Sequence, residues 1–267
     1  MSKLGLLVGH IHAVLHNAGH KLYALRLPLL IFSLFCSTIS FSQTCIIAKK
    51  TKDAIYLGSD SRFLRTSTVI KNGTYSIDTG SMCKIFSNGI YNFALSGHYL
   101  EESKNEIIKA VNNGGSFRKV IQEYSDSFRE WLQLHLGELS RNMPIDSFES
   151  HIQKNYIYAN AIFWGTDSDS LFLAMPYFTV RIDTNKRVLF VDSFLAENHV
   201  LYAGHFFNII NKIEKETWRR NIPKTIKSLI SIEIKANEFE VGGQIHLIKF
   251  TNKKGLEWIG GQKPPCN

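Results

Sequence analysis

The feature that most constrains the fold is a change of hydrophobic period in the middle of the chain. From Leu100 to Arg141, apolar residues recur every three or four positions, with one break at the sequence "NNGG". This spacing predicts two consecutive amphipathic helices. Before them, short apolar runs at residues 45–48, 54–59, 81–86 and 90–96 predict antiparallel strands joined by tight turns. The chain must therefore pack helices against antiparallel strands.

The alternation of strands and helices continues to the end of the chain. Strand-like runs cover residues 156–164, 171–175, 178–182 and 188–191, and helical spacing returns at 206–216 and, after Pro223, at 226–236. Two more strand-like runs close the sequence, "QIHLIKF" and "LEWIG". No linker, repeat or low-complexity segment divides this order. We expect residues 43–267 to form one α+β domain, with two face-to-face sheets between outer pairs of helices.

The first 42 residues differ from the rest of the chain. They contain three basic residues and no acid, followed by the apolar run Leu27–Phe41, with Ser40 and Ser42 at the −3 and −1 positions of a cleavage site. This pattern predicts a signal peptide with an N-terminal extension over residues 1–42. An uncleaved anchor is the alternative, but the run is shorter than the ~20 residues that span a bilayer. We expect a secreted or periplasmic protein with no stable membrane insertion after leader cleavage.

Charge and cysteine content exclude several functions. Removal of the leader leaves 28 Lys and Arg against 23 Asp and Glu, and the basic residues are scattered, so nucleic-acid binding is not predicted. Cys45, Cys83 and Cys266 remain, and their odd number allows one disulfide at most, with its pairing open. None of the three has metal-ligand spacing. We expect neither a metal nor a cofactor.

A group of reactive residues follows the leader. Thr44 opens the first strand, and a threonine at a mature N-terminus has a free α-amino group that can act as base for its own hydroxyl. Asp60 lies at the end of the second strand in "DSR", Lys84 lies in "CKIF", and Gly97 ends "NFALSG". Each residue alone has an ordinary structural explanation. We expect Lys84→Ala to abolish such activity and to leave the fold largely intact, because a functional lysine contributes little packing.

Together, "TCIIAKKTKDAIYLGSDSR", "KIF" and "NFALSG" resemble the opening of proteasome β-type subunits and their bacterial ring-peptidase relatives, which are N-terminal-nucleophile hydrolases. The resemblance implies a four-layer αββα sandwich with Thr44 as nucleophile. It implies that Lys84 favours the neutral amine and the alkoxide, that Asp60 orients this lysine, and that the Gly97 amide donates to the oxyanion. The implied substrate is a peptide or small amide, and the implied assembly is a homo-oligomeric ring.

The sequence departs from the family pattern in two places. The family has a Ser-Gly pair near the start of its third helix, where this chain has Gly204 and His205. It also has a serine before two glycines, where this chain has Val241. The alternative function is therefore a non-catalytic domain used for binding or assembly. A leader cut before Gln43 would also leave Thr44 second in the chain, so catalysis requires that Gln43 be removed.

Three other motifs have weaker functional interpretations. "IDTGS" at residues 77–81 resembles an aspartic-peptidase signature, but a catalytic dyad needs two such aspartates, so we expect a loop there. A leader cut between Thr44 and Cys45 would instead expose Cys45 as the nucleophile, and this alternative stays open. Asn72 in "NGT" is a glycosylation sequon only in a eukaryotic secretory pathway.

Overall fold

The structure is a computed structural model that describes residues 44–71, 74–88, 90–97, 99–142, 148, 157–158, 160–183, 188–204, 206–216, 218, 221–238 and 241–260. The predicted leader, Gln43, Asn72, His205 and Cys266 lie outside the described residues. The chain divides into two compact units, one of residues 1–39 and 65–78 and one of residues 40–64 and 79–267. Each unit is treated separately below.

The described residues of the first unit belong to two strands that pair as a two-stranded sheet. The strands are β3 (Arg62–Lys71) and β4 (Thr74–Ser81), of which residues 62–64 and 79–81 belong to the second unit. Both were missed by the strand predictions. The motif "IDTGS" lies in β4, so the predicted loop at residues 77–81 is wrong.

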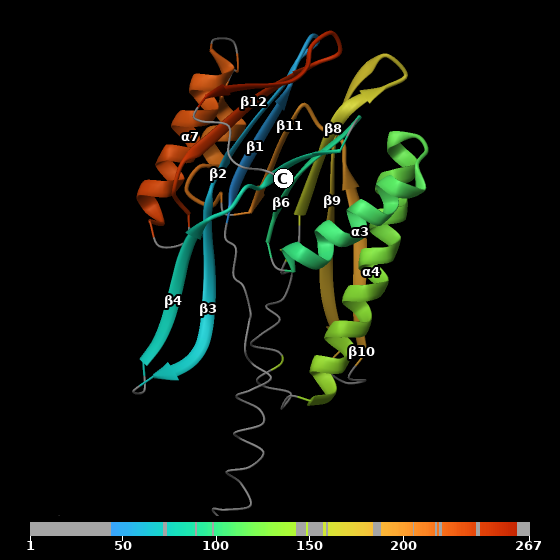
Figure 1. The fold of residues 1–267 in the computed structure, drawn as a ribbon, viewed down its shortest axis with the longest axis vertical. Helices are drawn as coiled ribbons and strands as arrows, with labels where there is room; N and C mark the ends of the chain where they lie inside the picture. Colours follow the sequence, from blue (N-terminus) through green and yellow to red (C-terminus); the bar gives the residue numbers. More distant parts are fainter. Residues whose placement is uncertain are drawn as a thin grey trace, which may run out of the picture. The chain divides into compact units, whose positions relative to one another are not determined.

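The second unit contains two antiparallel sheets (Figure 1). The five-stranded sheet has the order β11-β1-β2-β12-β13. Its strands are β1 (Cys45–Lys50), β2 (Ile55–Asp60), β11 (Val200–Gly204), β12 (Ile245–Thr251) and β13 (Gly255–Gly260). The predictions for β1, β2, β12 and β13 are confirmed, and β11 was not predicted.

The other sheet has six strands in the order β10-β9-β8-β6-β5, and β7 pairs with β9. Its strands are β5 (Ile85–Asn88), β6 (Tyr91–Ser96), β7 (Ile157–Tyr158), β8 (Asn160–Asp167), β9 (Ser170–Asp183) and β10 (Val188–Ala196). The two strands predicted at 171–175 and 178–182 are one continuous strand, β9. Pro176 does not interrupt it, because this residue pairs in register with Leu195 on β10.

Two long helices cover the outer face of the six-stranded sheet, and both confirm the prediction from hydrophobic spacing. They are α3 (Leu100–Asn113) and α4 (Phe117–Asn142). The aromatic rings of Tyr124 and Phe128 on α4 pack against Phe163 on β8 and Phe178 on β9, with ring centroids 5.0–5.8 Å apart. This contact joins α4 to the sheet through buried aromatic side chains.

The outer face of the five-stranded sheet carries one long helix, α7 (Ile222–Ala236). Asn221 caps it by accepting a hydrogen bond from the Lys224 amide at 3.2 Å, and Pro223 occupies the first turn. The helical spacing predicted at 206–216 gives only the six-residue helix α6 (Ile210–Lys215). The turn at residues 207–209 precedes it.

The expected four-layer αββα sandwich is therefore wrong. The described residues form two antiparallel sheets and a separate two-stranded ribbon, with few helices, and one sheet carries a single long helix where a pair was expected. The physical reason is that the apolar residues around Phe206 pack in a turn instead of extending a helix. For example, the rings of Phe206 and Tyr202 lie 4.6 Å apart in an edge-to-face contact.

The two sheets of the second unit pack face to face through a buried apolar cluster. Its members come from strands of both sheets, namely Ile46, Ala48, Ile55, Leu57, Ile85, Ala94, Ile162, Trp164, Leu171, Leu173, Leu201, Ala203, Ile248 and Phe250. In β1 the residues of this cluster alternate with residues that face α6 and α7, as expected for a strand covered on both sides. Among the described residues, no helix combines the length and the hydrophobicity needed to cross a membrane.

Gly58 on β2 is expected to set the distance between α7 and the sheet. A Cβ atom at this position would clash with Ile226 and would lie 2.9 Å from Leu247 Cδ2 and 3.0 Å from Ile230 Cδ1. We expect Gly58→Ala to lower the free energy of unfolding by about 1–3 kcal/mol, because the helix must move away from the sheet. Urea unfolding measures this change.

Gly137 on α4 provides the matched control for Gly58. No atom lies within 4 Å of a Cβ added there. Gly137→Ala should leave stability equal or raise it by up to about 1 kcal/mol, because alanine favours the helix. Equal unfolding free energies for the two variants would contradict the close packing of α7 at Gly58.

Candidate functional site

A buried ion pair connects the two sheets of the second unit. Lys84 Nζ lies 3.3 Å from Asp60 Oδ1, and the side chains are 1% and 0% exposed. Asp60 ends β2, and Lys84 immediately precedes β5, where its carbonyl oxygen accepts a hydrogen bond from the Leu95 amide at 3.1 Å. The structure thus brings together two of the four residues predicted for the site.

Backbone amides surround the rest of the Asp60 carboxylate. Its Oδ1 accepts from the Cys45 amide at 2.8 Å, and its Oδ2 accepts from the amides of Gly242 and Arg62 at 3.0 and 3.3 Å. Three backbone donors and one ammonium therefore compensate a carboxylate that is wholly removed from water. They also fix the start of β1 and the loop before β12 to the end of β2.

Thr44 lies directly before β1, next to the amide that donates to Asp60. Its side chain is fully buried. Because side chains alternate along a strand, Thr44 shares a face with Ile46, which packs between the sheets. Cys45 belongs to the opposite face and packs with Ile47 in the apolar cluster under α6 and α7.

Gly204 on β11 allows the backbone of Thr44 to approach closely. Gly204 has φ +80, and an added Cβ would overlap the Thr44 carbonyl oxygen and lie 3.3 Å from Ser96 Cβ. Gly97, the fourth predicted residue, follows Ser96 at the end of β6 and has φ 100. The Gly204 departure from the family pattern is thus a position where this backbone has no room for a serine.

Gly204→Ala tests this close approach. The added Cβ is expected to displace Thr44 and to lower the free energy of unfolding by about 2–4 kcal/mol, since a positive φ and a backbone overlap combine. Gly255→Ala is the matched control, because Gly255 has φ +68 and nothing within 4 Å of an added Cβ. Thermal unfolding of both variants separates the two effects. Equal losses would show that the φ angle alone matters at Gly204.

Burial shifts the proton affinities of two groups in this region. It lowers the pKa of Lys84 below its ordinary value, and the nearby Asp60 carboxylate partly opposes this change. Burial also raises the pKa of Cys45 well above its ordinary value, and Asp60 adds to the rise. Cys45 is a free thiol, whereas Cys83 is disulfide-bonded. A buried, protonated thiol is a poor nucleophile, which disfavours Cys45 in that role.

Sequence reasoning missed two residues around the ion pair. Gly242 donates its amide to Asp60, although the two residues are 182 positions apart. His246 on β12 is 4% exposed, and within the described part of the chain its Nδ1 has no hydrogen-bond partner. Burial lowers the pKa of His246, which favours the neutral ring. Gly242 stands out in the sequence only as one of the two glycines after Val241, and His246 carries no local signal, since a lone histidine is common in strands.

The second departure from the family pattern lies in the apolar core. Val241 is fully buried in the cluster with Ile226 and Ile230 of α7, and its amide donates to the Asn237 carbonyl at 2.9 Å. A serine at this position would bury a hydroxyl among aliphatic side chains. In the described residues, no group of three or more His, Cys, Asp or Glu side chains is arranged to hold a metal ion.

Comparison with known proteins assigns neither a family nor a relative to the chain. No protein-family model matches the chain, and no curated protein matches it.

Proposed function

We propose that the chain is an exported amide hydrolase in which Thr44, once it is the N-terminal residue, is the nucleophile. The observation that carries the proposal is the buried Lys84–Asp60 pair, which the Cys45 amide fixes beside Thr44. Burying an ion pair is costly, and hydrophobic residues often stabilise a core as well. A buried ammonium held by the carboxylate that also accepts from the amide after Thr44 is therefore better explained by chemistry than by stability. The resemblance to proteasome β-type subunits supports the same roles.

The proposed reaction needs no group from outside this site except substrate and water. The α-amino group, with an ordinary pKa of about 8, takes the proton of the Thr44 hydroxyl. The oxygen attacks the amide carbonyl, and the Gly97 amide donates to the resulting oxyanion. The C–N bond then breaks, and the leaving amine takes the proton from the α-amino group. Water hydrolyses the Thr44 ester and releases the acid.

Lys84 supports this reaction through its charge. An ammonium close to Thr44 disfavours a second positive charge, so it keeps the α-amino group neutral and able to accept a proton. It also stabilises the alkoxide that forms during attack. Asp60 keeps the ammonium in place through the 3.3 Å contact.

Processing of the N-terminus controls this activity. In the full-length chain the Thr44 nitrogen is a peptide amide and the Thr44 side chain is fully buried, so it has neither a base nor access to substrate. Residues 1–43 must be removed, which fits a leader that directs export. Outside the cytoplasm no ATP-driven unfoldase delivers folded proteins, so the substrates are small peptides, amides or unfolded chains. The resemblance to ring-forming relatives supports the assembly of several copies of the chain as a ring.

The N-terminus of the exported protein tests the proposal. We expect intact-mass and N-terminal analysis to show a chain that begins at Thr44 and that hydrolyses a fluorogenic peptide. Thr44→Ser should keep hydrolysis, because serine supplies the same hydroxyl, whereas Thr44→Ala should lose it. Hydrolysis that persists in Thr44→Ala would place the nucleophile elsewhere.

The second candidate is a non-catalytic domain used for binding or assembly, and the complete burial of Thr44 favours it. A uniform start at Gln43, or at its cyclised pyroglutamate form, together with no hydrolysis, would establish this candidate. The α-nitrogen of Thr44 would then stay in an amide.

A further inference from the structure

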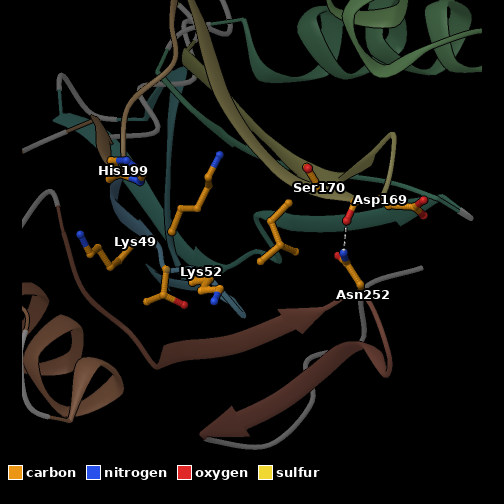
Figure 2. Close-up of a pocket in the computed structure, with 9 residues that line it drawn as sticks. Lys49, Lys52, Asp169, Ser170, His199 and Asn252 are labelled. Atoms are coloured by element: carbon orange, nitrogen blue, oxygen red, sulfur yellow. Dashed lines mark hydrogen bonds between the residues drawn. The ribbon is translucent and has the colours of Figure 1, made fainter.

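A pocket of about 590 Å³ opens at the end of β1 opposite to Thr44 (Figure 2). Lysines of β1 and of the following turn line one part of it, and Asp169, Ser170 and Asn252 line another. Because β1 has six residues, this pocket lies roughly 20 Å from Thr44. It is therefore separate from the candidate site and independent of the proposed function.

Hydrogen bonds between neighbouring turns hold the rim of the pocket in place. Asn252, in the β12–β13 turn, donates its Nδ2 to the Asp169 carbonyl at 2.8 Å and accepts from Thr166 Oγ1 at 2.9 Å. On the other side, the Lys50 amide donates to the His199 carbonyl at 2.8 Å. The walls thus come from both sheets and are fixed by the fold instead of by a ligand.

The pocket has an excess of positive charge. Lys49, Lys50 and Lys52 line it, against a single carboxylate, that of Asp169. Within the part of the chain that the structure describes, none of these lysines forms an ion pair. In Figure 2, the Asp169 carboxylate lies on the far side of the pocket from Lys49 and His199.

One of these lysines is also partly withdrawn from water. Lys49 Nζ lies 5.7 Å from the centre of the Trp218 ring, and partial burial lowers its pKa. Trp218 is not among the residues that line the pocket, so we assign phosphate binding to Lys50 and Lys52.

We propose that this pocket binds the phosphate group of a small molecule. Lysine ammoniums bind phosphate as point charges, and a phosphate group carries more negative charge than a single carboxylate, which suits a lining with several lysines. The site is concave and is bordered by the β1–β2, β8–β9 and β12–β13 turns, which suits a small ligand better than a polymer backbone. Buried Leu171 provides an apolar surface for an organic remainder.

Calorimetric titration of the full chain with inorganic phosphate and with phenyl phosphate, at constant ionic strength, tests the proposal. We expect one saturable site for a phosphate group. Tighter binding of phenyl phosphate would identify an organic phosphate as the ligand, and equal affinities would identify free phosphate. Lys50→Gln and Lys52→Gln should each weaken binding about tenfold, as expected for one lost charge-assisted hydrogen bond.

Lys227→Gln is the matched control, because Lys227 is exposed on α7 and does not line the pocket. It makes the same change in net charge and should leave the affinity unchanged. Absence of saturation with both phosphates would overturn the proposal. An equal loss of affinity in Lys227→Gln and Lys52→Gln would also overturn it, since binding would then follow the overall charge. Unfolding curves of the three variants confirm that each is folded.

Discussion

Lys84→Met is expected to abolish hydrolysis and to lower the free energy of unfolding by about 3–5 kcal/mol, the usual cost of removing one partner of a buried ion pair. Methionine nearly fills the volume of the lysine side chain. The loss of stability therefore measures the cost of leaving the buried Asp60 carboxylate without its ion-pair partner. This result would differ from the sequence-based expectation that Lys84→Ala leaves the fold largely intact. That expectation assumed little packing, whereas Lys84 is among the largest fully buried side chains of the described residues.

Urea unfolding of wild type and Lys84→Met gives the loss in stability, and the fluorogenic peptide gives the loss in activity. Lys109→Met is the matched control, because Lys109 pairs with Glu106 at 2.6 Å but is 69% exposed. It should change stability by no more than about 1 kcal/mol, because water screens exposed pairs. A similarly small change in Lys84→Met would mean that the backbone donors alone satisfy Asp60.

The elements that were predicted correctly are those with long or strongly apolar patterns. The helices α3 and α4 span 14 and 26 residues, over which a period of 3.6 is unmistakable. β11 has five residues, too few for a period to emerge, and it forms because β1 offers it a paired edge. The sequence of β3, "RFLRTSTVIK", mixes charged and polar residues without a clean alternation.

The residues of the candidate site also divide into those that the sequence indicates locally and those that only the folded chain brings together. Thr44, Asp60 and Lys84 could be named from the sequence because all three lie at strand ends in the first part of the chain, where their order carries the resemblance. The structure joins Asp60 and Lys84, and the roles of all three stay a prediction. That Gly242 and His246 reach the site could not be predicted, because this depends on the pairing of β12 with β2. Hydrophobic periodicity indicates that a strand exists but does not indicate which strand is its neighbour.

Asp60→Asn is expected to be at least as destabilising as Lys84→Met. All four groups bonded to Asp60 are donors, with Cys45 N and Lys84 Nζ at Oδ1 and the amides of Gly242 and Arg62 at Oδ2. The NH₂ group of an asparagine would face either the two donors at the Oδ1 position or the two donors at the Oδ2 position, whichever way the amide is turned. We expect a loss of about 3–5 kcal/mol from the broken pair and the unsatisfied donors.

A double-mutant cycle separates these contributions to the loss in Asp60→Asn. Asp60→Asn combined with Lys84→Met should cost clearly less than the sum of the two single changes, because each removes the same ion pair. The exposed pair of Asp192 and Arg181, at 2.6 Å, supplies the control, and Asp192→Asn should cost no more than about 1 kcal/mol. Additive losses in the cycle would show that Asp60 stabilises the chain through its backbone amides alone. The loss in Lys84→Met would then arise from the other surroundings of the buried Lys84 side chain and not from its contact with Asp60.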